Sequence, residues 1–127
     1  MKKLSAVLLS FLLLAGCTAA PSAGSAYRQI TAQEAVDMMH SDPDALILDV
    51  RTPEEFASGH IPNAINIPLD TIGSEPIPQL PKKDQVILVY CRSGNRSKTA
   101  SQKLAEQGYT QIFEFGGIKD WPGPITE

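Results

Sequence analysis

The chain has 127 residues and a formal net charge of −3 at neutral pH, and 43% of its residues are hydrophobic. This length has room for one domain, and the acidic balance argues against nucleic acid as a partner. The two histidines, His40 and His60, are far apart, and there are only two cysteines, so no spacing of metal ligands is present. We therefore expect no metal and no cofactor.

The first 16 residues have the layout of an export signal. A basic start, MKK, precedes an almost wholly apolar run over residues 4–14, which is shorter than the ~20 residues that a membrane-spanning helix needs. The tetrapeptide Leu14 to Cys17 resembles the lipobox of bacterial lipoproteins, in which cleavage precedes a lipidated cysteine. The sequence therefore predicts an exported lipoprotein, anchored in a membrane through Cys17 and facing the periplasm or the cell exterior. A plain signal peptide with an incidental cysteine is the alternative.

Residues 17–26 are small and uncharged, and they predict a flexible tether before a folded domain over residues 27–127. Loss of the signal would remove two lysines and change the net charge to −5. Against this acidic background, Arg92 and Arg96 form a local basic cluster beside Cys91. With the first cysteine lipidated, Cys91 would have no disulfide partner in the chain, which indicates a reactive thiol.

Strand and helix signals alternate along the folded part. A short strand over residues 27–30 precedes a helix over residues 31–40, in which Thr31 and Glu34 have the form of a capping box. The continuous apolar run over residues 45–50 predicts a strand that is buried on both faces. Such strands are typical of the centre of a parallel sheet.

Asp49 places a carboxylate inside this second strand, and Arg51 follows it closely. Because a buried carboxylate needs partners, we interpret Asp49 as a structural acceptor for backbone amides or for Arg51, with direct catalysis as the alternative. A short helix is predicted from Thr52 to Ser58, and His60 follows in a loop. We interpret His60 as a structural hydrogen-bonding residue in preference to a general base, since nothing places it beside a reacting proton.

The centre of the sequence is the run VILVYC. A short strand over residues 65–67 and a proline-rich connection over residues 69–81, with a helical turn near residues 70–72, lead up to it. Residues 86–90 are β-branched, aliphatic and aromatic, so they predict a buried strand, and Cys91 stands where that strand ends.

A basic, glycine-containing loop follows and opens into a helix predicted from Ser97 to Gln107. The loop residues are Arg92, Ser93, Gly94, Asn95 and Arg96. A last strand is predicted over residues 111–114, and we interpret the lone Trp121 as a packing residue. The alternation predicts an α/β fold, with a small, open, mostly parallel sheet flanked by helices on both faces.

The loop after Cys91 has the composition that activates a thiol. Only a thiolate is a good nucleophile, and a free cysteine with a pKa of about 8.5 is mostly protonated at neutral pH. Two guanidinium groups, inward-pointing backbone amides and the start of a helix would together favour the anion. Ligands of open parallel sheets sit at the carboxyl ends of strands, which is where Cys91 lies. A buried structural cysteine before an ordinary turn is the alternative.

Several motifs together resemble a single-domain rhodanese, a thiosulfate sulfurtransferase. They are DVR at 49–51, EF at 55–56, GHIPNAINIP at 59–68, CRSGNR at 91–96 and GG at 116–117. They stand in the expected order, the resemblance extends from Tyr27 to Trp121, and the export signal makes the small periplasmic rhodaneses the most similar members. Asn63 departs from the glycine that many members have, but both residues suit turns.

Loop length separates this resemblance from phosphatases and arsenate reductases of the same fold. Those relatives place five residues between cysteine and arginine, whereas four lie between Cys91 and Arg96. Ser97 occupies the position where the longer loop would need its arginine. The resemblance therefore implies a tighter cradle, suited to a single sulfur atom.

The resemblance also implies a mechanism. The Cys91 thiolate would attack the outer sulfur of thiosulfate, release sulfite and keep a persulfide, which cyanide or a thiol then removes. Amides of residues 92–97 would stabilise the persulfide, the two loop arginines would attract the anionic donor, and Asp49 and Arg51 would brace the site. The implied partners are a small anionic sulfur donor and a thiol or cyanide acceptor, and we expect a monomer.

Two functions of other classes remain as alternatives. Rhodanese domains also occur as non-catalytic binding modules, although the intact loop favours an enzyme. A thiol redox protein is less consistent with the sequence, because no second thiol is available to resolve a mixed disulfide at Cys91.

Overall fold

The computed structural model describes residues 26–127. The predicted signal peptide, Cys17 and the tether up to residue 25 lie outside the described residues. The elements in chain order are β1 (Arg28–Gln29), α1 (Ala32–Ser41), β2 (Leu46–Asp49), α2 (Pro53–Ser58), β3 (Ile65–Asn66), the 3₁₀ helix η1 (Leu69–Thr71), β4 (Val86–Cys91), α3 (Asn95–Glu106), β5 (Gln111–Gly117) and the 3₁₀ helix η2 (Ile118–Asp120).

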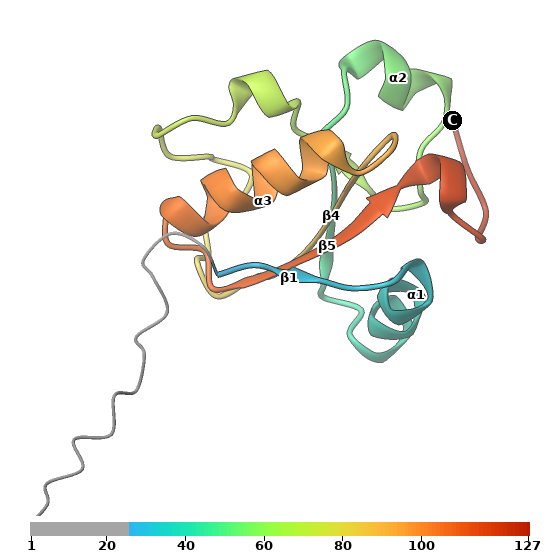
Figure 1. The fold of residues 1–127 in the computed structure, drawn as a ribbon, viewed down its shortest axis with the longest axis horizontal. Coiled ribbons are helices and arrows are strands. Elements are labelled where there is room, and N and C mark those ends of the chain that lie inside the picture. Colours follow the sequence, from blue (N-terminus) through green and yellow to red (C-terminus); the bar gives the residue numbers. More distant parts are fainter. Residues whose placement is uncertain (1–25) are drawn as a thin grey trace, which may run out of the picture.

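The described strands form one five-stranded sheet in the order β1-β5-β4-β2-β3, and all neighbouring strands are parallel. Helices α1 and α3 cover opposite faces of this sheet (Figure 1). The predicted α/β class, with an open sheet between helices, is therefore confirmed. The described sheet is wholly parallel, because β-α-β connections return each strand in the same direction.

The central strand β4 contributes side chains to the apolar core on each face of the sheet. Ile87, Val89 and Cys91 belong to the apolar cluster that includes residues of α3, whereas Leu88 and Tyr90 belong to the cluster that includes residues of α1. Alternate side chains of a strand point to opposite faces, so a strand covered on both sides is apolar throughout. Cys91 thus ends β4 on the face that α3 covers.

Both helices of the first half begin at a capping box, as their sequences predict. The Thr31 hydroxyl accepts from the Glu34 amide at 3.0 Å, and the Thr31 amide donates to Glu34 Oε1 at 3.1 Å. Thr52 and Glu55 make the same reciprocal pair before α2, at 3.2 and 3.3 Å. These bonds satisfy helix amides that have no partner within the helix.

Two element boundaries near the predicted site differ from the sequence prediction. Helix α3 begins at Asn95 and not at Ser97, because Gly94 ends the loop in the left-handed region with φ of 104°. Strand β5 continues past Glu114 to Gly117. The loop after Cys91 is therefore shorter than predicted, and Ser97 lies within the first turn of α3.

A bulge connects β4 and β5 at their carboxyl ends. Val89 pairs with Glu114, but the next register pair joins Cys91 to Gly117, so β5 has an extra residue there. Gly116 takes up the distortion with φ of 92°, which a residue with a side chain rarely adopts.

Within residues 26–127, no helix is long and apolar enough to span a membrane.

Candidate active site

The sulfur of Cys91 lies under the loop that follows it. Its Sγ atom accepts a hydrogen bond from the Gly94 amide at 3.0 Å, and the Ser97 Oγ atom lies 3.4 Å away. The residue as a whole is 1% exposed. The sulfur therefore faces polar groups of the loop and the first turn of α3, although the rest of the side chain belongs to the apolar core.

The polar groups around this sulfur favour its anion. Burial acts to raise the pKa of the Cys91 thiol, but hydrogen bonds from the Ser97 hydroxyl and from the amides of Ser97, Gly94 and Ser93 outweigh it. The pKa of Cys91 is consequently below its usual value. A thiolate at neutral pH is the form that acts as a nucleophile.

Glycines allow the loop and the end of β5 to approach each other closely. A Cβ atom at Gly117 would overlap the Arg92 carbonyl and lie 2.6 Å from Ser93 Cα. Gly94 has a positive φ of 104°, and a Cβ atom there would be in ordinary contact with Gly116 Cα at 3.5 Å. The loop can rest on β5 only because Gly117 has no side chain.

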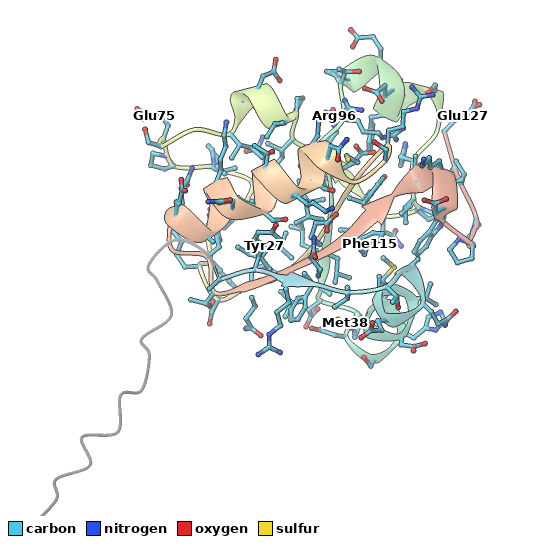
Figure 2. The ribbon with its side chains drawn as sticks, in the orientation of Figure 1. Tyr27, Met38, Glu75, Arg96, Phe115 and Glu127 are labelled. Carbon is cyan, nitrogen blue, oxygen red and sulfur yellow. The ribbon has the colours of Figure 1, made fainter. Side chains whose placement is uncertain are left out.

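The two loop arginines have different environments. Arg96 donates to both carboxylate oxygens of Glu55, at 2.7 and 2.9 Å. Figure 2 places Arg96 in the first turn of α3, beside α2. The hydrogen bond to Arg96 is the main reason that the pKa of Glu55 falls to about 2, and Glu55 raises the pKa of Arg96. Arg92 is exposed, as are Ser93 and Asn95. The ordered cation near the sulfur is therefore Arg96, held by α2.

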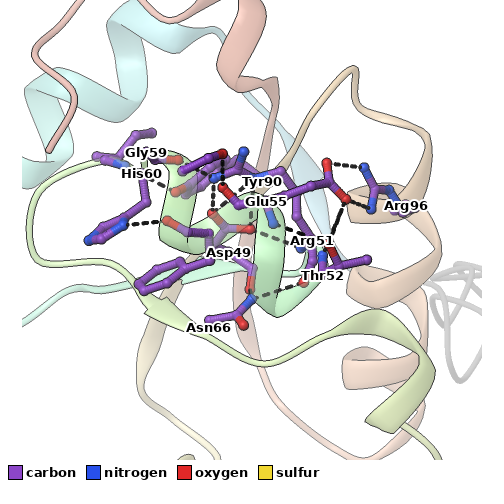
Figure 3. A network of polar contacts seen from close by, with 12 residues as sticks. Asp49, Arg51, Thr52, Glu55, Gly59, His60, Asn66, Tyr90 and Arg96 are labelled. Atoms are coloured by element: carbon purple, nitrogen blue, oxygen red, sulfur yellow. Dashed lines mark hydrogen bonds and ion pairs between the residues drawn. The ribbon is translucent and has the colours of Figure 1, made fainter. Parts of the chain in front are cut away.

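Asp49 and Arg51 form a buried ion pair at the carboxyl end of β2 (Figure 3). Asp49 is 0% and Arg51 5% exposed, and Asp49 Oδ1 accepts from the Arg51 amide at 2.8 Å. Arg51 also donates to the Gly59 carbonyl, and the Asn66 side chain donates to the backbone carbonyls of both members of the pair. A buried pair needs such additional hydrogen bonds to offset its lost hydration.

This network fixes the segment that carries α2. Arg51 precedes the cap residue Thr52, and the same cap binds Glu55, which in turn holds Arg96 (Figure 3). The Tyr90 hydroxyl accepts a hydrogen bond from the Ile61 amide at 3.1 Å, which ties the segment after α2 to β4. The structure thus places Asp49 and Arg51 away from direct contact with the sulfur, in a position that orients Arg96 through α2.

His60 and Trp121 pack against aromatic side chains and have hydrogen-bond contacts with backbone carbonyls. His60 stacks on Phe56 with ring centroids 3.7 Å apart, and its Nδ1 atom lies 2.9 Å from the Phe56 carbonyl. Trp121 packs against Phe115, and its indole nitrogen donates to the Pro124 carbonyl. Neither geometry involves the Cys91 sulfur.

Glu114 is a site residue that the sequence analysis did not single out. It is 2% exposed, and its Oε1 atom accepts from Ser97 Oγ at 2.6 Å and from the Gly116 amide at 2.8 Å. The available signal was an acid in an otherwise apolar strand, the same signal that drew attention to Asp49. It was missed because strand β5 was predicted to end at this residue, where an acid would be solvated.

Comparison with known proteins identifies the family and the fold. A family model for the rhodanese-like domain matches residues 31–123. The chain belongs to the rhodanese-like family. Its match takes in the whole sheet except β1, and it includes Cys91 and the loop that follows.

Individual relatives agree with this assignment. The chain is 40% identical over 73 residues to thiosulfate sulfurtransferase PspE of Escherichia coli K12, covering 58% of this chain and 70% of that protein. It is 42% identical over 79 residues to a sulfurtransferase of Allochromatium vinosum, covering 61% and 72%. A solved E. coli rhodanese with anions superposes with a TM-score of 0.60 at 38% identity, covering 65% of this chain and 98% of that one.

Proposed function

We propose that this rhodanese-like domain is a thiosulfate sulfurtransferase that carries sulfur as a persulfide on Cys91. One observation carries the proposal: the Cys91 sulfur, at the carboxyl end of the central strand, accepts a hydrogen bond from the Gly94 amide and has a lowered pKa. An amide aimed at this sulfur stabilises a thiolate before reaction and a persulfide anion after it. The sulfurtransferase names of the relatives support the same activity.

The reaction exchanges one sulfur–sulfur bond for another. The Cys91 thiolate attacks the outer sulfur of thiosulfate, a new S–S bond forms, and the original S–S bond breaks with its electron pair leaving on sulfite. Cyanide or a thiolate acceptor then attacks the terminal persulfide sulfur, and Cys91 leaves as a thiolate. Each step is a nucleophilic displacement on sulfur, as in thiol–disulfide exchange, and needs no cofactor.

The charges around the loop suit an anionic donor. Arg96, whose pKa is raised by Glu55, keeps a fixed cation near the sulfur, and the exposed Arg92 adds a second cation at the loop surface. Such cations raise the local concentration of a dianion such as thiosulfate. Asp49 and Arg51 contribute indirectly, because they hold the helix that orients Arg96 through Glu55.

Trapping the intermediate tests the proposal. After incubation with thiosulfate and removal of excess reagent, the intact protein should gain the mass of one sulfur atom, and peptide analysis should place it on Cys91. Cyanide should then remove this mass and release a stoichiometric amount of thiocyanate. An unchanged mass, with no thiocyanate formed, would favour the non-catalytic binding module.

The loop geometry disfavours the phosphatase-like alternative. That chemistry requires an arginine where this chain has Ser97, and Ser97 is fully buried, with its hydroxyl directed to Cys91 and Glu114. A guanidinium group at this position would have to displace the buried carboxyl contact. A cradle that closes on its own serine is suited to a sulfur atom in preference to a phosphate group.

We further propose that the domain acts as a monomer at a membrane surface, facing the periplasm or the cell exterior, with lipid on Cys17. The basic, apolar and small-residue segments before Cys17 support this location. In a bacterial host, the protein should fractionate with membranes and be extracted by detergent, and Cys17→Ser should move it to the soluble or unprocessed fraction. A Cys17→Ser protein that has lost its signal peptide and still fractionates with membranes like the wild type would contradict a lipid anchor.

A further inference from the structure

The carboxyl group of Glu114 has no assigned role in sulfur transfer, yet it is buried beside the reacting thiol. The ion pairs within 4.0 Å in residues 26–127 are Arg51–Asp49 and Arg96–Glu55, so no described cation pairs with it. A buried carboxylate without a cation is costly. The hydrogen bonds that it accepts from Ser97 and from the Gly116 amide must therefore offset its lost hydration.

Ser97 connects this carboxyl to the thiol. Its Oγ atom lies 2.6 Å from Glu114 Oε1, 3.4 Å from Cys91 Sγ and 3.0 Å from the Gly94 carbonyl, and the Gly116 carbonyl is 3.4 Å away. A serine hydroxyl has only one hydrogen to donate. It can stabilise an anion on Glu114 or an anion on Cys91, but not both at once.

The short contact between Ser97 Oγ and Glu114 Oε1 fits one of two possible arrangements of the protons. With Glu114 ionised, Ser97 donates to the carboxylate at 2.6 Å, and the Cys91 thiol donates to the Ser97 oxygen. When Cys91 is an anion, the Ser97 hydrogen is needed at the sulfur, and an ionised Glu114 would then lose its strongest donor and face a second buried negative charge. Both effects favour a protonated Glu114 in that state.

We propose that Glu114 and Cys91 share one proton through Ser97, so that Glu114 is protonated whenever Cys91 is a thiolate or a persulfide. In the transfer, the Ser97 oxygen takes the proton of the thiol as its own hydrogen passes to Glu114 Oε1. One S–H bond breaks, one O–H bond forms on the carboxyl group, Ser97 is unchanged, and no electrons enter or leave. Glu114 is thus a positioning residue for a proton, and the buried site keeps a single negative charge throughout.

Among the charged and titratable groups near this carboxyl, Cys91 is the one that Ser97 links to it. The titratable or charged residues on the neighbouring parts of the elements packed around it are Cys91 on β4, Arg92 in the loop, Arg96 and Lys98 in the first turn of α3, Arg28 on β1 and Lys119 after β5. Arg92 and Lys119 are exposed. Arg28 and Lys98 are exposed, and Arg96 is paired with Glu55. Tyr90 of β4 belongs to the core on the opposite face.

A titration of the Glu114 carboxyl group tests this inference. Protein with isotope-labelled glutamate is titrated by NMR, and the Glu114 resonance is assigned by its absence from Glu114→Gln. We expect its midpoint, or the second of two steps, to lie about 1 pH unit or more higher in the wild type than in Cys91→Ser, whose hydroxyl stays neutral. Equal midpoints would show that Glu114 does not hold the proton and would overturn the proposal.

Two serines on α3 provide a matched pair of background variants. Ser97→Ala removes the hydroxyl between the two groups, whereas Ser101→Ala removes a buried hydroxyl that has no hydrogen-bond partner among the described residues. The difference in midpoint between proteins with and without the Cys91→Ser substitution should shrink in the Ser97→Ala background and persist in the Ser101→Ala background. A difference that survives Ser97→Ala in full would exclude Ser97 as the link.

The persulfide state is the part of the inference that rests on the proposed function. In thiosulfate-treated protein, the Glu114 resonance should remain that of a protonated carboxyl at a pH where the same group in Cys91→Ser is ionised. If no persulfide forms, the proposed function fails, but the comparison of the untreated proteins still decides whether the proton is shared. If a persulfide forms beside an ionised Glu114, the shared proton is wrong and the sulfurtransferase stands.

Discussion

Replacing Cys91 with serine is expected to reduce cyanide-dependent thiocyanate formation by about 10³-fold or more, the scale of loss when a catalytic nucleophile is removed. Serine can still accept the Gly94 hydrogen bond that Cys91 accepts at 3.0 Å, so the loop keeps its main contact. What is lost is the ionisable sulfur, because an alcohol is not deprotonated by this cradle at neutral pH. Steady-state assays with thiosulfate and cyanide measure the effect.

Thermal unfolding and a second variant separate this loss from a folding defect. Cys91→Ala leaves only a small void at a residue that is 1% exposed and should be as inactive as the serine variant. Both should unfold cooperatively, with far-ultraviolet circular dichroism like that of the wild type. Activity within tenfold of the wild type in either folded variant would remove this thiol from the mechanism.

Gly117→Ala should disrupt the site through the backbone. The added Cβ would overlap the Arg92 carbonyl and lie 2.6 Å from Ser93 Cα, and neither backbone atom can rotate away. We expect a loss of about 1–3 kcal/mol in the free energy of unfolding, as for an overpacked core. For a domain of this size, that loss lowers the unfolding midpoint by about 4 °C or more. Differential scanning calorimetry measures it.

The activity of Gly117→Ala should fall by more than its stability explains. Moving Arg92 and Ser93 away from β5 also moves the Gly94 amide away from the Cys91 sulfur, which it now contacts at 3.0 Å. The pKa of the thiol should rise accordingly, and alkylation of Cys91 by iodoacetamide at neutral pH should slow. Slower alkylation in a protein that is still folded at the assay temperature identifies displacement of the loop as the cause.

Gly73→Ala is the matched control for this prediction. It adds the same methyl group at an exposed glycine where a Cβ would meet nothing within 4 Å. Its unfolding midpoint, alkylation rate and activity should equal those of the wild type. If Gly117→Ala behaves like Gly73→Ala, the close approach of the loop to β5 does not determine the geometry of the site.

The local signals in the sequence determined most of the architecture. The apolar runs that became β2 and β4 are buried on both faces, and the capping boxes at Thr31 and Thr52 begin helices α1 and α2. These signals are local, because an apolar run and a capping box consist of residues only a few positions apart. The apolar run over residues 86–90 likewise predicts that Cys91 lies at the end of a central strand, and Cys91 is the last residue of β4.

The relations between distant segments were decided by the tertiary structure alone. Glu114 lies 17 positions after Ser97, and only the parallel pairing of β4 with β5, with its bulge, brings this carboxyl under the start of α3. In the same way, the sequence predicts Arg96 as a loop cation that attracts an anionic donor, but it does not show that Glu55, 41 positions earlier, holds this side chain. Most elements, the thiol and the basic loop can be predicted from the chain, since they follow from local pattern. Which groups share a proton or a charge depends on packing, because interactions at hydrogen-bond distance between remote residues leave no periodic trace in the chain.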